Sequence, residues 1–113
     1  MRAQTKIIFL DDQNQKFFGE GPAQLLHAIE TYGSLRRAAI SMNMAYTKAL
    51  KIIQNAEHAL GFALTIRITG GKTGGGSQLT SEGKEWLNTY EAYRNACIQA
   101  NQRLYLEFFS QQS

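Results

Sequence analysis

The chain has 113 residues, the size of one small domain, and carries a net charge of +3. Its single cysteine, Cys97, excludes an internal disulfide and has no zinc-ligand pattern around it, so we expect no metal site, no cofactor and a reducing, cytoplasmic environment. No apolar run reaches the roughly 18 residues of a membrane span and the N-terminus lacks a signal-peptide core, so we expect no membrane partner.

The first predicted elements are a small hairpin and a helix. An apolar run over residues 7–10, a polar turn and the pair Phe17-Phe18 predict an N-terminal β-hairpin. Pro22 suits the first turn of a helix, and apolar residues then recur at helical spacing as far as Tyr32. Gly33 is predicted to end this helix.

Two further helices are predicted on either side of a tight turn. Ser34 can cap a second helix of about two turns, and Asn43 can take the left-handed conformation that the turn needs. A third helix is predicted over residues 45–60. Its apolar face carries Ala49, Ile52, Ile53, Ala56 and Leu60, and its opposite face carries Thr47, Lys48, Lys51, Gln54 and Asn55. The outer face therefore holds hydrogen-bonding groups, two cations and no acid.

The segment after the third helix alternates apolar and polar residues, which predicts a strand with Leu64, Ile66 and Ile68 on a buried face. A glycine cluster and a short return strand follow, and they predict a β wing over residues 68–79 with Lys72 near its tip. A flexible hairpin tip without a ligand is the alternative. The cluster does not fit a nucleotide-binding Walker loop, because Ile66 stands where that motif requires its first glycine.

The last predicted helix runs from Ser81, after a cap at Thr80, to about Phe109. It has more apolar positions than so small a domain can bury alone. We assign Trp86 and Tyr90 to the core of the chain itself. The residues that we expect to contact a second copy in a homodimer are Leu104, Tyr105, Phe108 and Phe109.

The order helix, helix, tight turn, helix and two-stranded wing is that of a winged helix-turn-helix. We therefore expect a mainly α (α+β) fold. Residues 1–80 would form the winged helix-turn-helix with its N-terminal hairpin, and residues 81–113 would form a dimerisation helix. In this arrangement the helix over residues 45–60 reads the major groove of double-stranded DNA, while the wing grips phosphates.

The charge pattern supports DNA as the partner. Between Ser34 and Leu79 six basic residues and the single acid Glu57 give +5, whereas the other six basic and eight acidic residues give −2. The candidate DNA contacts are Ser34, Arg36, Arg37, Tyr46, Thr47, Lys48, Lys51, Arg67 and Lys72. For Tyr46, packing within the chain is as good an interpretation as a DNA contact. For Arg37, the alternative is an ordinary solvated charge on the surface.

Two stretches, "LLHAIETYGSLRRAAISMNMAYTKALKII" and "TGGKTGGGSQLTSEGKEWL", also resemble a known family. They are similar to the N-terminal DNA-binding domain of molybdate-dependent transcriptional regulators of the ModE type, and more distantly to LysR-type regulators. The resemblance implies DNA binding and dimerisation. Family members often carry a lysine directly after the tyrosine that corresponds to Tyr46, whereas here Thr47 stands between Tyr46 and Lys48. We expect no molybdate binding by this chain.

Two other kinds of function compete with DNA binding. An enzyme is not expected, because His27 and His58 lie on different predicted helices without an acid or thiol pattern beside them. A protein-protein interaction module without a specific DNA target is the stronger alternative, since winged helices also bind proteins. Such a module would not need a middle segment with a charge of +5.

Overall fold

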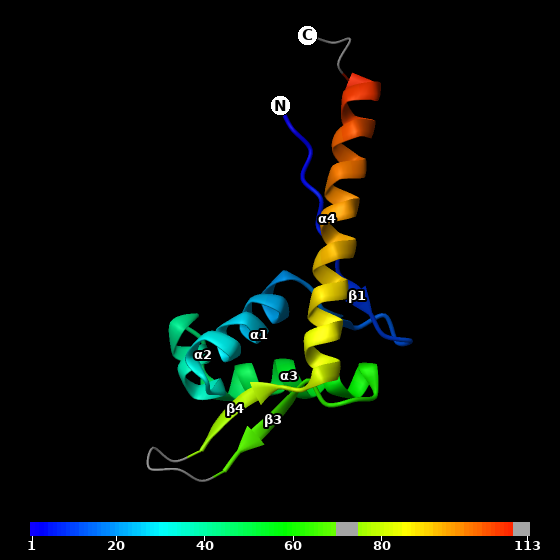
Figure 1. The fold of residues 1–113 in the computed structure, drawn as a ribbon. Helices are drawn as coiled ribbons and strands as arrows, with labels where there is room; N and C mark the ends of the chain where they lie inside the picture. Colours follow the sequence, from blue (N-terminus) through cyan, green and yellow to red (C-terminus); the bar gives the residue numbers. More distant parts are fainter. Residues whose placement is uncertain (70–74, 110–113) are drawn as a thin grey trace.

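The computed structural model describes residues 1–69 and 75–109. The elements in chain order are β1 (Phe9–Leu10), β2 (Lys16–Phe18), α1 (Glu20–Tyr32), α2 (Leu35–Ser41), α3 (Tyr46–Leu60), β3 (Thr65–Ile68), β4 (Gly76–Leu79) and α4 (Ser81–Phe109). The first three helices and the β3–β4 hairpin form a base, from which α4 projects (Figure 1). This is the mainly α winged helix-turn-helix expected from the sequence.

The turns between helices follow from residues that tolerate positive φ. Gly33 ends α1 at φ 76° and Gly61 ends α3 at φ 82°, and Asn43 adopts φ 52° in the turn between α2 and α3. The α2 helix begins at a true N-cap, since the Arg37 amide donates to Ser34 Oγ at 3.0 Å. The predicted cap and the predicted turn are both confirmed.

One hydrophobic core joins the helices, the first hairpin and the base of α4. Its largest fully buried side chains are Phe18, Leu25, Leu26, Ile29, Leu64, Leu87 and Tyr90. Trp86 packs edge-on against Phe18, with ring centroids 5.3 Å apart. The assignment of Trp86 and Tyr90 to the core is thus confirmed, and the first turns of α4 are fixed to the base.

The wing is anchored where it leaves the base. Strands β3 and β4 pair antiparallel from Thr65↔Leu79 to Ile68↔Gly76. The Ser77 amide donates to the Gly33 carbonyl at 2.8 Å, and a Cβ on Gly76 would collide with that same carbonyl oxygen. The wing therefore rests on the corner between α1 and α2, and glycine is required at the contact.

The predicted buried face of Leu64, Ile66 and Ile68 is wrong except at Leu64, which directly precedes β3. Leu64 is fully buried, but Ile66 and Ile68 are 52% and 43% exposed. The strand does alternate, yet the two-stranded wing extends past the core, so no described element covers that face. The first strand is also shorter than the apolar run, since β1 begins at Phe9.

The N-terminal segment lies along α4. Tyr90 donates its hydroxyl hydrogen to the Ile7 carbonyl, and Tyr105 donates its own to the Met1 carbonyl, both at 2.9 Å. Between them Asn101 Nδ2 donates to Thr5 Oγ1 at 2.6 Å. The segment and the projecting helix thus run side by side (Figure 1).

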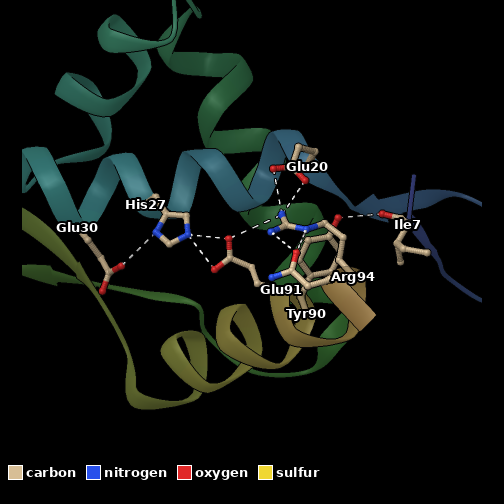
Figure 2. A network of polar contacts seen from close by, with 8 residues as sticks. Ile7, Glu20, His27, Glu30, Tyr90, Glu91 and Arg94 are labelled. Atoms are coloured by element: carbon tan, nitrogen blue, oxygen red, sulfur yellow. Dashed lines mark hydrogen bonds and ion pairs between the residues drawn. The ribbon is translucent and has the colours of Figure 1, made fainter. Parts of the chain in front are cut away.

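A polar network fixes the orientation of α4 against α1 (Figure 2). His27 Nε2 on α1 lies 2.9 Å and 3.0 Å from the two carboxylate oxygens of Glu91 on α4. One turn further along α4, Arg94 donates to both oxygens of Glu20 at 2.8 Å and 3.1 Å.

Although α4 has 29 residues, no helix in the described part of the chain has the length and apolar character needed to cross a membrane.

Candidate nucleic-acid interface

The helix α3 presents a polar outer face, as the sequence predicted. Ala49, Ile53 and Ala56 are buried, and Ile52 and Leu60 are half-buried against the core. The side chains predicted to point outward are all exposed: Thr47, Lys48, Lys51, Gln54 and Asn55. Because successive residues turn by about 100°, Thr47 and Lys51 stand near the middle of this outer face, opposite the buried residues.

Five of the nine candidate DNA contacts line one open groove beside α3. This wing groove, about 890 Å³ in volume, is lined by residues 32–37, Tyr46, residues 67–69 and residues 75–77. The candidate contacts that it brings together are Ser34, Arg36, Arg37, Tyr46 and Arg67. None of its described lining residues is acidic, so the wing groove is suited to an anion.

Three of these five side chains already have partners within the chain. The Arg36 guanidinium carbon lies 4.9 Å from the centroid of the Tyr46 ring, which is a cation-π contact between α2 and α3. Ser34 Oγ accepts the Arg37 amide hydrogen, so its hydroxyl keeps one hydrogen for another acceptor. Tyr46 is half-buried, and it faces the wing flank of α3 rather than the outer face.

A smaller groove, about 300 Å³ in volume, flanks α3 on its other side. This hairpin groove is lined by Lys16, Phe17, Gly21, Pro22, Met44, Lys48, Ile52 and Asn55. Lys16 from β2 thus lines the same groove as Lys48, an association that the sequence analysis missed. The only available signal was the positive charge of Lys16, because its position depends on how the first hairpin packs against α3.

The single acid of the basic middle segment is directed away from the outer face of α3. Glu57 Oε2 accepts the Leu64 amide hydrogen at 2.8 Å and has a longer contact of 3.4 Å to the Thr65 amide. The carboxylate therefore accepts hydrogen bonds from the backbone amides at the start of β3. It does not pair with a described cation of either groove.

Replacing Ser34 with alanine is expected to lower the free energy of unfolding by about 1 kcal/mol, because the Arg37 amide loses its acceptor. Urea unfolding of the variant measures this loss. Ser34→Asn should keep most of the stability, since asparagine is also a good N-cap. An unchanged midpoint in Ser34→Ala would show that the cap contributes nothing.

The candidates not yet placed are Lys72 and the four residues predicted to contact a second copy of the chain. Lys72 lies outside the described residues. Leu104, Phe108 and Phe109 on α4 are 51%, 73% and 44% exposed, as a free contact surface requires. Tyr105 differs, because it is half-buried and its hydroxyl binds the Met1 carbonyl. In the described ranges no three His, Cys, Asp or Glu side chains gather as metal ligands would.

Comparison with known proteins agrees with this geometry. Residues 23–84 match the family model described as bacterial regulatory helix-turn-helix protein, lysR family. The chain is 35% identical over 85 residues to the molybdenum transport protein ModE of Azotobacter vinelandii and 34% identical over 99 residues to that of Herbaspirillum seropedicae. These alignments cover 72% and 88% of the chain but 32% of each relative, so the chain spans about a third of their length.

Proposed function

Because the chain belongs to the lysR family of bacterial regulatory helix-turn-helix proteins, which are DNA-binding regulators and not enzymes, we propose that it recognises a specific sequence in double-stranded DNA. The outer face of α3 would enter the major groove. The observation that carries this proposal is the position of that face. It lies between two grooves that hold Arg36, Arg37 and Arg67 on one side and Lys16 and Lys48 on the other.

Within this proposal eight of the nine candidate residues divide into two groups, and the ninth, Tyr46, lies on the wing flank of α3 between them. Thr47, Lys48 and Lys51 would reach base edges or the nearest phosphates from α3. The residues assigned to the sugar-phosphate backbone are Ser34, Arg36, Arg37, Arg67 and, from the wing, Lys72. A regulator of this kind acts where the bacterial chromosome lies, so we place the protein in the cytoplasm.

Binding to duplex DNA of random sequence at increasing salt concentration tests the function. Each phosphate that the protein neutralises should lower the slope of log K against log salt by about 0.9, so several contacts give a steep fall. Selection of bound genomic fragments would then identify the specific site. A flat salt response would instead support the alternative, a winged-helix module that binds a protein partner.

We also propose that residues 81–113 form a two-fold dimer contact through the outer part of α4. Leu104 and Phe108 are one turn apart on the same side of the helix, and both are exposed. A two-fold dimer would present two α3 helices about 34 Å apart, one turn of DNA, and so match a palindromic site.

Leu104→Glu is expected to convert such a dimer to monomers, because a second copy would have to bury the new carboxylate. Sedimentation at micromolar concentration measures the change. Gln99→Glu is the matched control, since it adds the same charge at an exposed position on the side of α4 away from Leu104 and Phe108. A wild-type chain that sediments as a monomer would contradict the dimer.

A further inference from the structure

We propose that Tyr46 is a positioning residue: its ring holds the Arg36 guanidinium in the wing groove, where Arg36 binds one backbone phosphate. Tyr46 would then not read a base. This inference rests on the proposed DNA-binding function and deepens it. It assigns a phosphate-binding site to the wing groove, in which Arg36 is already held in position in the unbound protein.

The contact joins two elements that a DNA backbone would cross. Arg36 lies in the first turn of α2, and Tyr46 is the first residue of α3. The guanidinium carbon is 4.9 Å from the ring centroid, within the range of a cation-π interaction. Both residues line the wing groove, and Arg36 is exposed there, on the side where an anion could approach.

The positive charge of the wing groove suits it to bind an anion. Arg36, Arg37 and Arg67 line it together, and within residues 1–69 and 75–109 none of them has a carboxylate at ion-pair distance. Arg94 is a useful contrast. It also lies near an aromatic ring, 5.8 Å from the Tyr90 centroid, but it is paired with Glu20. Arg94 is therefore structural, whereas Arg36 keeps its donors for an external acceptor.

Stacking would improve phosphate binding by restricting the arginine beforehand. A free arginine loses rotamer entropy when it binds, and a guanidinium already held against a ring loses less. The planar fork of arginine suits both tasks, since one face stacks while the edge donates to phosphate. A lysine at the same position could supply the charge but could not stack as a plane.

A double-mutant cycle with random-sequence duplex DNA tests the inference. Arg36→Ala should weaken binding about tenfold and make the salt slope shallower by about 0.9, as expected for one lost phosphate contact. Tyr46→Leu should weaken binding about two- to fivefold, the amount that an exposed cation-π contact of ~0.5–1 kcal/mol supplies. Tyr46→Leu added to Arg36→Ala should cost nothing more, and Tyr46→Phe should restore the affinity lost in Tyr46→Leu.

Arg37 and Arg36→Lys provide the matched controls. Arg37 lines the same groove without a ring beneath it, so Arg37→Ala and Tyr46→Leu should have additive effects. Arg36→Lys should keep the wild-type salt slope and show a smaller coupling to Tyr46, because an ammonium keeps the charge but not the planar contact. These comparisons use variants with wild-type circular dichroism, and a change in packing alone would not produce the selective coupling.

Two results would overturn the inference while leaving the proposed function intact. The first is a Tyr46→Phe variant as weak as Tyr46→Leu, which would mean that the tyrosine hydroxyl contacts DNA itself. The second is full additivity of the Arg36 and Tyr46 substitutions. A wild-type chain without salt-dependent binding to the random duplex would overturn the proposed function and this inference together.

Discussion

Replacing Tyr90 with alanine is expected to lower the free energy of unfolding by about 3–5 kcal/mol, the range for removing a large buried aromatic side chain. The ring is 2% exposed and packs edge-on against Phe18, with centroids 5.0 Å apart, and against Phe9 at 6.0 Å. The substitution would leave a cavity where β1, β2 and α4 meet. Urea unfolding at neutral pH measures the loss.

Tyr90→Phe separates the ring from the hydroxyl. It should cost only about 0.5–1.5 kcal/mol, the value of the hydrogen bond to the Ile7 carbonyl. Burial, with a smaller contribution from the Glu20 charge, raises the pKa of Tyr90 above its ordinary 10.0. The stabilisation by the neutral phenol should therefore be complete below about pH 10 and decline as pH rises above it, because the unfolded chain ionises first.

In Tyr90→Phe this alkaline decline should be smaller, since the titrating group is gone. Two findings would contradict the account. One is a loss below 1 kcal/mol in Tyr90→Ala, which would mean that the aromatic cluster does not carry the junction of α4 with the base. The other is an alkaline unfolding profile that is identical in the wild type and in Tyr90→Phe.

The second large effect is expected at the outer face of α3. Lys48→Ala and Lys51→Ala should each weaken binding to the selected DNA site by ~1–3 kcal/mol if the lysine reads a base. Binding to random DNA should weaken less, so the ratio of specific to random affinity should fall. Fluorescence anisotropy with both duplexes at fixed salt gives this ratio.

Arg103→Ala is the matched control for loss of one positive charge. Arg103 is exposed on the outer half of α4, which projects away from the base that holds α3 (Figure 1). Its loss should leave the affinity ratio unchanged. If the lysine variants lower both affinities by the same factor, then Lys48 and Lys51 contact phosphates only. If they lower neither, the assignment of α3 as the reading helix is wrong.

The α3 helix shows how much the sequence could predict. Its apolar residues recur at helical spacing, and this spacing alone places Ala49 and Ile53 inside and Lys51 outside. The turn at Asn43 was equally predictable, because few residues adopt positive φ without strain. Both predictions depend only on residues that lie close together in the sequence, so the local sequence pattern was sufficient for them.

What could not be predicted depends on how separate elements pack. The alternation in β3 identifies two faces of a strand, but it does not tell whether any element covers Ile66 and Ile68. The cation-π contact between Arg36 and Tyr46 depends on the relative orientation of α2 and α3. The association of Lys16 with Lys48 likewise arises from the packing of β2 against α3.

The contacts of the N-terminal segment have a practical consequence for anyone who labels the protein. Met1 is held beside Tyr105, near the far end of α4 and away from the base that contains α3 and its two grooves. An affinity tag or fluorescent reporter fused to Met1 would therefore lie nearest the proposed dimer contact on α4. If the proposed dimer forms, such a fusion is expected to weaken it while leaving the outer face of α3 accessible.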